Sequence, residues 1–455
     1  MKILFAASEI YPYAKTGGLA DVADALPKSL QKECDIFTVM PLYSFIDKEC
    51  MKVFKQIELD LGGVGYDVTF YTLNNHFFIE APLLSTTAHL YGDTTGDYVS
   101  NDLRFGIFCK AIATLCEILE IDIAHLNDWH TALSALFIQE KGLHTKTLFT
   151  IHNLAYQGIF PKESLGRLGI DTRYFTMQTL EYYGNINFLK AGIALSDAVT
   201  TVSPTYAQQI LTPEFGCGLD GMLRYHQHKL TGILNGINTD VFDPKSDPNL
   251  FCNYDANSLE QKYKNKVAFL KHSTLKDPRK PLFVLLSRLV EQKGIDILLG
   301  IMPRILEKKL NLFILGEGSS EEVTKLSNFA QKYPNFEFRN CYDEILSHQA
   351  YGAADFLLMP SRFEPCGLAQ MIAMRYGVIP IVHATGGLRD SVFETEEQCG
   401  RGVRFEKFSK KEFLLAIDRG LLLRSDDALK HFNMQCDFSF KKSAQAYLRV
   451  YRSLV

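Results

Sequence analysis

The sequence predicts an α/β protein built from two similar units, each a parallel sheet with helices on its faces. Short apolar runs, such as residues 2–7 and 281–286, are typical of strands that are buried on both faces. Glycine-containing loops follow these runs and lead into segments with helical spacing, as in a βαβ unit. Residues 16–21 (TGGLAD) also match residues 385–390 (TGGLRD) at five of six positions, so both halves contain one kind of strand-to-helix turn.

Composition excludes several classes of protein. The chain has 455 residues, 47% hydrophobic and 22% charged, with a net charge of −4, so neither a polyanionic partner nor a nucleic acid is indicated. No run approaches the roughly 18 uninterrupted apolar residues of a membrane-spanning helix, and Glu9 closes the N-terminal apolar run too early for a signal peptide. Ten cysteines without a Cys-x-x-Cys pair predict reduced thiols in a cytoplasmic protein.

The first half reads as alternating strands and helices with one β-rich insertion. Apolar residues Leu19, Val22, Leu26 and Leu30 mark one face of a helix after the first glycine turn. The insertion covers residues 43–100 and is not predicted to be a separate domain. The predicted strands are 2–7, 35–40, 66–73, 76–80, 123–126, 146–151 and 198–202, and a second helix is predicted at 102–119.

The second half repeats the pattern after a polar, proline-containing stretch at 238–253, which reads as a linker region. We therefore predict domains at 1–237 and 238–436, with a C-terminal helix over 437–455. The predicted strands are 281–286, 311–316, 336–338, 355–360 and 378–382, and the predicted helices are 295–308, 343–353, 368–375, 410–424 and 438–452.

Polar side chains gather at the predicted carboxyl ends of these strands, where α/β sheets bind their ligands. Cations beside glycine-opened helices suit a phosphate or a diphosphate, while carboxylates and an imidazole suit a polyhydroxylated sugar. Together they indicate a nucleotide-sugar, although each residue taken alone could be a cap or an exposed turn residue. The residues are Lys15, Asp128, His152, Arg288, Lys293 and Glu364.

Other cofactors and ligands are less well supported by the sequence. Gly316 and Gly318 lack the third glycine of a dinucleotide fingerprint, because Glu321 stands in its place. The chain contains neither a P-loop nor an Asp-x-Asp pair. His125 and His130 straddle a strand end without the spacing of helical metal ligands, so neither a metal nor a cofactor is predicted.

Seven short motifs occur in order along nearly the whole chain, and their combination is specific although each alone is weak. They are residues 15–21 (KTGGLAD), 152–158 (HNLAYQG), 201–205 (TVSPT), 234–237 (LNGI), 287–294 (SRLVEQKG), 361–368 (SRFEPCGL) and 385–388 (TGGL). With these motifs the chain resembles bacterial glycogen synthases and plant starch synthases, which are retaining glucosyltransferases of the GT-B type.

The resemblance implies two Rossmann-like domains that face each other across a cleft, with the last helix crossing back to the first domain. It implies transfer of glucose from ADP-glucose to the non-reducing end of an α-1,4-glucan, such as glycogen or a maltooligosaccharide, without a cofactor or metal. The first domain would take the acceptor and part of the donor, and the second would take the nucleotide-sugar. The expected class is hexosyltransferase (ADP-glucose:1,4-α-glucan 4-α-glucosyltransferase), acting in the cytoplasm.

The resemblance also implies a role for individual residues. His152, Arg288, Lys293 and Glu364 would be catalytic: the two cations neutralise the departing ADP, and the other two contact the glucosyl unit. Lys15 and Gly18 would lie by the diphosphate. The remaining donor-binding positions are Asp21, Asp128 and Asn235, Tyr342 stacked on the adenine, and Cys366, Gly367 and Leu368 at a helix start that holds a phosphate.

The sequence departs from the family pattern at three places. Ala369 stands where many relatives have threonine, Ile372 replaces the second glutamate of the wider superfamily, and the insertion at 43–100 is short. The alternatives are a glucan phosphorylase, a GT-B transferase with another nucleotide-sugar donor, and a catalytically weak glycan-binding or regulatory protein. A phosphorylase would need a pyridoxal-phosphate lysine site and a longer chain. Intact Lys15, Arg288, Lys293 and Glu364 argue against an inactive protein.

Overall fold

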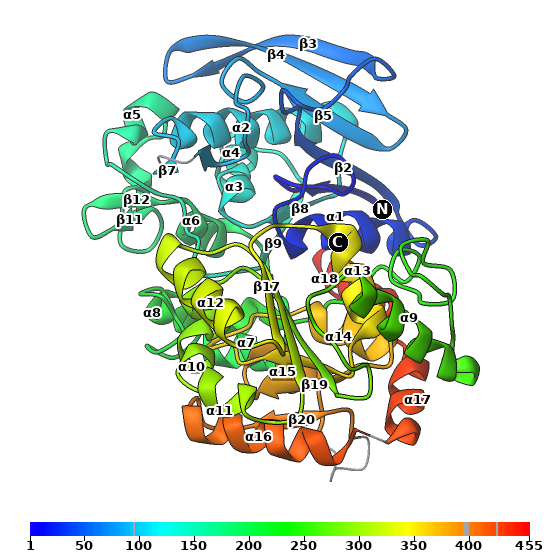
Figure 1. The fold of residues 1–455 in the computed structure, drawn as a ribbon. Coiled ribbons are helices and arrows are strands. Elements are labelled where there is room, and N and C mark those ends of the chain that lie inside the picture. Colours follow the sequence, from blue (N-terminus) through cyan, green and yellow to red (C-terminus); the bar gives the residue numbers. More distant parts are fainter. Residues whose placement is uncertain (94–95, 395–399, 425) are drawn as a thin grey trace. The chain divides into compact units, whose positions relative to one another are not determined.

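The computed structural model describes residues 1–93, 96–394, 400–424 and 426–455 (Figure 1). The chain divides into two compact units: unit 1 is Met1–Asn235 with Phe440–Val455, and unit 2 is Gly236–Ser439. The last helix therefore belongs to the first unit, as the resemblance implies. Both units are α/β, which confirms the predicted fold class.

A nine-stranded sheet forms the centre of unit 1 in the described residues, with the order β14-β13-β9-β8-β1-β2-β5-β4-β3. Neighbouring strands are parallel from β14 to β5, whereas β4 runs antiparallel to both β5 and β3. The strands are β1 (Lys2–Ala6), β2 (Asp35–Pro41), β3 (Lys52–Leu61), β4 (Val64–Leu73), β5 (His76–Glu80), β8 (Ile123–Asn127), β9 (Lys146–Ile151), β13 (Ala198–Thr201) and β14 (Leu230–Gly232).

The predicted β-rich insertion is an extension of this central sheet, because β5 pairs in parallel with β2. Strand β3 was not predicted from the sequence. Its side chains are mostly exposed, and only Leu59 and Leu61 are buried, so it lacks the apolar run that marks the central strands. The remaining strands of unit 1 form two small antiparallel sheets, from β6 (Gly92–Asp93) and β7 (Gly96–Asp97), and from β10 (Ile159–Phe160), β11 (Glu181–Tyr182) and β12 (Asn185–Asn187).

Helices α1 and α18 pack on one face of the unit 1 sheet, in one core with Ile3 and Phe5 of β1. Because side chains alternate along a strand, Leu4 and Ala6 are buried on the opposite face. His125 joins α18 to the sheet, with its Nδ1 2.6 Å from Tyr451 Oη. The helices are α1 (Gly18–Leu30), α2 (Asn101–Leu119), α3 (Trp129–Ala132), α4 (Ser134–Glu140), α5 (Ser164–Leu168), α6 (Phe188–Leu195), α7 (Pro204–Gln209), α8 (Asp220–Tyr225) and α18 (Lys441–Leu454), with short 3-10 turns η1 (Thr172–Tyr174) and η2 (Gln227–Lys229).

Unit 2 contains a second parallel sheet with the order β17-β16-β15-β18-β19-β20. The first five of these were predicted within one or two residues, since four are short apolar runs and β17 has two alternating phenylalanines. Because all six strands are parallel, their carboxyl ends lie at one edge of the sheet. The strands are β15 (Leu282–Leu286), β16 (Asn311–Leu315), β17 (Phe336–Arg339), β18 (Phe356–Met359), β19 (Ile379–His383) and β20 (Val403–Phe405).

The helices of unit 2 differ from prediction in two ways. The single helix expected over 295–308 is two short helices, because the chain breaks at Gly300 and Pro303 lacks the backbone N–H that a helix interior requires. Helices α9, α12 and α17 were not predicted. The helices are α9 (Glu260–Lys271), α10 (Ile295–Leu299), α11 (Met302–Leu306), α12 (Ser320–Lys332), α13 (Glu344–Ala353), α14 (Ala369–Arg375), α15 (Gly386–Ser391), α16 (Lys410–Leu422) and α17 (Asp427–Gln435), with 3-10 turns η3 (Ala256–Ser258) and η4 (Glu291–Lys293).

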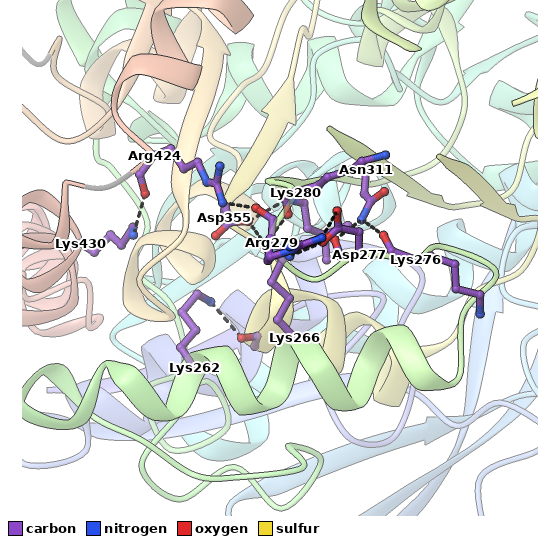
Figure 2. A network of polar contacts seen from close by, with 12 residues as sticks. Lys262, Lys266, Lys276, Asp277, Arg279, Lys280, Asn311, Asp355, Arg424 and Lys430 are labelled. Carbon is purple, nitrogen blue, oxygen red and sulfur yellow. Dashed lines mark hydrogen bonds and ion pairs between the residues drawn. The ribbon is translucent and has the colours of Figure 1, made fainter. Parts of the chain in front are cut away.

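Two buried lysines of α9 hold this helix against the sheet of unit 2 (Figure 2). Lys266 Nζ lies 2.6 Å from Asp355 Oδ2, immediately before β18, and also donates to the Lys280 carbonyl. Lys262 Nζ donates to the carbonyls of Tyr351 and Gly352 at 2.8 and 3.0 Å, so it caps the last turn of α13. Burial lowers the pKa of both lysines.

Three further predictions concern the linker region, the cysteines and membrane-spanning helices. Residues 238–253, predicted as a linker region, are part of unit 2, where the buried Asp247 accepts hydrogen bonds from His348 and Tyr376. Nine cysteines are free thiols, and the tenth, Cys399, lies outside the described residues. Within the described ranges, none of the helices has the length and hydrophobicity that a membrane crossing requires.

Candidate active site

Glu364 is the buried centre of the polar residues in unit 2. It lies in the loop between β18 and α14 and is 5% exposed. Its Oε2 lies 2.6 Å from Lys293 Nζ and accepts a hydrogen bond of 2.9 Å from Ser361 Oγ. A buried carboxylate without a partner would be costly, so the lysine and the serine stabilise it and fix its position. The predicted residues Lys293 and Glu364 are therefore in direct contact.

The backbone of this loop rests on the second glycine turn of the chain. Gly387 N–H donates to the carbonyls of Glu364 and Pro365, at 3.1 and 3.2 Å. A Cβ atom at Gly386 would overlap the Glu364 carbonyl, and one at Gly387 would overlap Cys366. The two glycines therefore allow the turn before α15 to approach the Glu364 loop at a distance that no other residue permits.

Cys366, Gly367 and Leu368 form the turn that leads from Glu364 into α14. Cys366 is buried, and Leu368 is the N-cap residue of this seven-residue helix. Gln370 Nε2 donates to the carbonyls of Cys366 and Gly367, at 3.2 and 2.8 Å. Ala369, the first residue of α14, contributes no hydroxyl, and Ile372 is buried in the core.

Arg288 and Tyr342 lie after β15 and β17, at the same edge of the sheet as Glu364. Both side chains are exposed, and Tyr342 retains 68% of its accessible surface. The Leu289 N–H donates to the Glu317 carbonyl at 2.7 Å, which joins the loop after β15 to the loop after β16. An arginine and an exposed aromatic ring at the carboxyl edge of a parallel sheet are suited to a phosphate and a flat base, respectively.

In unit 1, Lys15 precedes the first glycine turn, and α1 begins at Gly18. Lys15 Nζ lies 2.8 Å from Asp21 Oδ1, in the first turn of that helix, and 5.4 Å from the centre of the Tyr11 ring. The side chains of Lys15 and Asp21 are 21% and 15% exposed. The structure thus brings together Lys15, Gly18 and Asp21, and it holds the ammonium group at the N-terminus of a 13-residue helix.

Asp128 and His152 follow the neighbouring parallel strands β8 and β9. Asp128 has a positive φ of 57° and is 8% exposed, and its Oδ1 accepts the His152 backbone N–H at 2.7 Å. His152 Nε2 lies 2.9 Å from Asn127 Oδ1. An amide oxygen can only accept, so His152 Nε2 is the donor, which leaves Nδ1 as an acceptor in the neutral ring.

Burial shifts the pKa values of Asp128 and His152 in opposite directions. It raises the pKa of Asp128 to about 7, although the N–H groups of His152 and Asn153 partly oppose this shift. It lowers the pKa of His152 to about 3, so the ring is neutral near pH 7. His152 therefore offers a neutral hydrogen-bonding ring, not a cation and not a strong base.

Asn235 follows β14, the strand at one end of the unit 1 sheet. The residue is 5% exposed, and its Oδ1 is buried without a hydrogen-bond partner among the described residues. Buried amide oxygens are nearly always paired, so this acceptor is suited to a donor group on a ligand. Its neighbour Leu234 is held by Ser443 Oγ of the C-terminal segment, at 2.6 Å.

Three residues near these positions were not predicted from the sequence. Asn127 orients the His152 ring, Glu9 holds the loop that contains Lys15, and Tyr91 contacts Glu9. A signal was present only for the first two: Asn127 ends β8 and Glu9 lies three residues after β1, so both are polar residues at the carboxyl end of a buried strand, where α/β sheets bind ligands. Tyr91 lies in the irregular part of the predicted insertion, where no such signal exists.

No metal site is apparent at these residues. Across residues 1–93, 96–394, 400–424 and 426–455, no three His, Cys, Asp or Glu side chains are placed so that they could hold an ion. His125 bonds to Tyr451 and Thr150 instead, and the ring of His130 stacks on Tyr91 with a centroid distance of 4.6 Å.

Comparison with known families gives two matches that together cover most of the chain. Residues 2–225 match the starch synthase catalytic domain, and residues 267–433 match the glycosyl transferases group 1. Among relatives, a glycogen synthase of Aquifex aeolicus is 41% identical over 100% of this chain and 99% of its own length. A glycogen synthase of Geotalea daltonii is 39% identical over 99% of this chain and 98% of its own length.

Solved structures show the same relation. The catalytic domain of starch synthase IV from Arabidopsis thaliana, bound to ADP and acarbose, is 33% identical with a TM-score of 0.91, over 100% of this chain and 99% of that domain. A sucrose-phosphate synthase from Thermosynechococcus elongatus matches with a TM-score of 0.65 over 100% of this chain and 98% of its own. At 17% identity, this second likeness concerns the fold alone.

Proposed function

The chain belongs to the family of bacterial glycogen synthases and plant starch synthases, and we propose that it transfers glucose from ADP-glucose to the non-reducing end of an α-1,4-glucan, with retention. It is a GT-B hexosyltransferase whose family uses a nucleotide-sugar donor and a glucan acceptor. The finer proposal, ADP-glucose in glycogen biosynthesis, is supported by the ADP in the Arabidopsis starch synthase.

The observation that carries the proposal is the Lys293–Glu364 pair at the carboxyl edge of the unit 2 sheet, with Arg288 at the same edge. When the bond between glucose and ADP breaks, negative charge develops on the diphosphate. We assign to Arg288 and Lys293 the role of stabilising this negative charge. Prepositioned cations favour the transition state, because the charge develops there. We assign Cys366, Gly367 and Leu368 to a phosphate and Tyr342 to the adenine.

The glucosyl unit becomes positively charged as the ADP leaves. Glu364 is suited to this charge and to sugar hydroxyls, because its carboxylate is buried and fixed by two contacts. The neutral ring of His152 and the amide of Asn235 offer further hydrogen bonds to the sugar, with Asp128 beside them. None of these groups needs to be a strong base, since in a retaining transfer a phosphate oxygen of the leaving group can take the acceptor proton.

We further assign Lys15, Gly18 and Asp21 of unit 1 to the donor diphosphate, and the acceptor glucan to unit 1. The ion pair of Lys15 with Asp21 keeps a cation at the start of α1, where backbone N–H groups also favour an anion. The nine free thiols support a cytoplasmic location.

An incorporation assay tests the proposal. The purified protein is incubated with maltooligosaccharides and either radiolabelled ADP-glucose or radiolabelled UDP-glucose. We expect label in longer α-1,4-linked chains, with ADP-glucose as the better donor. Absence of incorporation from both donors would contradict the synthase activity, and a preference for UDP-glucose would contradict the assignment of the donor.

A further inference from the structure

A buried carboxylate in unit 1 connects two segments that lie far apart in the sequence. Glu9 follows β1 by three residues and is 3% exposed. Its Oε2 accepts the Thr16 backbone N–H at 2.5 Å, and its Oε1 accepts the Thr16 hydroxyl at 2.6 Å. The hydroxyl of Tyr91 donates to the same Oε1 at 2.5 Å. Both oxygens of Glu9 are therefore used, and all of these partners are donors.

Thr16 is the residue between Lys15 and the N-cap of α1. The carboxylate holds it at two points, the N–H and the hydroxyl, so the peptide that joins Lys15 to Thr16 has a fixed orientation. Thr16 and Gly17 themselves are exposed. The loop that contains Lys15 thus lies at the surface but is anchored from below by a buried anion.

Tyr91 extends the same arrangement into the segment before α2. Its hydroxyl lies 2.8 Å from Ser8 Oγ, and its ring stacks on His130, which follows β8. Ser8 is joined in turn to Tyr43, whose hydroxyl donates to the Ser8 carbonyl at 2.9 Å. The side chain of Glu9 is therefore fixed by residues that follow the strands of the unit 1 sheet and by Tyr91. Through Glu9, the position of Thr16 depends on these residues and not only on its own loop.

We propose that Glu9 is a positioning residue for the transfer reaction, which acts by holding Thr16 so that Lys15 and the start of α1 are preorganised for the donor diphosphate. This inference rests on the proposed function of Lys15. Preorganised charges bind without a cost of reorganisation, so loss of the anchor is expected to weaken donor binding more than it slows the chemical step.

The test is Glu9→Gln, which keeps the shape of the side chain and replaces one acceptor oxygen by an NH2 group that can only donate. With the amide oxygen towards the Thr16 N–H, the new NH2 group faces the hydroxyls of Thr16 and Tyr91, which must turn from donor to acceptor. Three hydrogen bonds to a charged group thus become neutral ones. We expect the KM for ADP-glucose and the Kd for ADP, measured by calorimetry, to rise about tenfold, since hydrogen bonds to a charged group are the strong ones. We expect kcat to change less than threefold.

A double variant separates positioning from general damage. If Glu9 acts through Lys15, then adding Glu9→Gln to Lys15→Gln should raise the Kd for ADP less than twofold further. An equal tenfold increase in both backgrounds would overturn the proposal, because the two residues would then act independently.

Asp197→Asn is a matched control in the same unit. Asp197 Oδ2 accepts the N–H and the hydroxyl of Thr147, at 2.8 and 2.9 Å, but it does so at the amino end of β9 and β13. This variant should leave the KM for ADP-glucose unchanged. Thr16→Val, which removes only the hydroxyl contact, should raise that KM about threefold and serves as the test if Glu9→Gln does not fold.

The outcomes distinguish this inference from the proposed function. An active wild-type enzyme whose KM and Kd do not respond to Glu9→Gln, or respond equally to Asp197→Asn, would overturn the role of Glu9. A wild-type protein without incorporation from ADP-glucose would instead contradict the proposed function, and the Kd for ADP would still report on the anchor.

Discussion

The two Thr-Gly-Gly-Leu turns share a sequence but differ in what they contact. In unit 1, α1 begins at the second glycine, Gly18, and Thr16 and Gly17 are exposed above the carboxylate of Glu9. In unit 2, α15 begins at the first glycine, Gly386, and the whole turn is buried against the Glu364 loop. The turn in unit 1 can therefore meet a ligand directly, whereas the turn in unit 2 supports another loop.

This difference shows why a repeated motif does not predict a repeated role. Both turns follow a strand of a parallel sheet and open a helix, as the sequence predicts. The turns differ in two respects. The helix starts one residue earlier in the unit 2 turn than in the unit 1 turn, and, among the described residues, only the unit 2 turn has another loop packed on it. Glycine is needed where that loop packs closely. In unit 2 that need is clear, because a Cβ at Gly386 or Gly387 would overlap backbone atoms of the Glu364–Cys366 segment.

The largest expected effect is at the loop that the unit 2 turn supports. Glu364→Gln removes the charge that pairs with Lys293 at 2.6 Å and that we assign to the transition state. We expect kcat to fall by about 10² to 10³, since one prepositioned electrostatic contact is typically worth that much. Steady-state kinetics with ADP-glucose measures it.

Glu406→Gln is the control for this variant, because Glu406 is a 57% exposed carboxylate of unit 2 with surface ion pairs to Arg389 and Arg404. It should leave kcat unchanged, as exposed pairs contribute little. A kcat near normal for Glu364→Gln would contradict the catalytic role of the carboxylate and would leave the buried turn of unit 2 with a purely structural function.

The second-largest effect is expected at the glycine turn of unit 2. Gly387→Ala inserts a methyl group where Cys366 already lies, so the Glu364 loop has to move. We expect the free energy of unfolding to fall by about 1 to 3 kcal/mol, as for other overpacked sites. We also expect kcat to fall about tenfold, because a small displacement of a catalytic group is costly. Chemical denaturation and kinetics measure the two effects.

Acid should destabilise unit 1, because burial lowers the pKa values of the buried His125 and His130 and of the half-buried His152. Below about pH 6.5 the unfolded chain binds protons that these native rings do not bind. Each histidine should therefore remove about 1.4 kcal/mol of stability per pH unit as the pH falls. Asp128 opposes one of them between pH 7 and 4, since burial raises its native pKa to about 7.

The sole tryptophan of the chain, Trp129, lies in unit 1 and reports on that unit. Urea titrations at pH 7, 6 and 5, followed by its fluorescence, should show the loss of stability. His152→Gln should make the dependence on pH shallower by about one proton. A transition of Trp129 that does not change with pH would contradict the lowered pKa values and the neutral state of these three rings.

The sequence predicts the regular parts of this fold well and the polar contacts of the site poorly. Strands such as β15 and β16 are short apolar runs, which are typical of strands buried on both faces. Motifs place Lys293 and Glu364 in the loops that follow strands. The break between α10 and α11 depends on Gly300 and Pro303, whose effect a helical pattern hides.

Contacts between distant segments were beyond prediction. The bond of Glu9 to Tyr91 spans 82 positions, and that of His125 to Tyr451 spans 326. Neither follows from local spacing, because the strand order that creates them is decided by packing of the whole unit. For the same reason the sequence could not show that one of its two glycine turns is exposed and the other buried.

The smallest expected effect is Gly17→Ala, the counterpart of Gly387→Ala. Gly17 has a φ of −160°, which any residue adopts, and no atom lies within 4 Å of the position of a Cβ. Alanine loses less entropy on folding than glycine but is a poorer N-cap, so the two terms oppose each other. We expect the free energy of unfolding to change by less than about 0.5 kcal/mol, as at other surface sites. A loss as large as that of Gly387→Ala would mean that the unit 1 turn is packed as tightly as its counterpart, and exposure would then no longer distinguish the two turns.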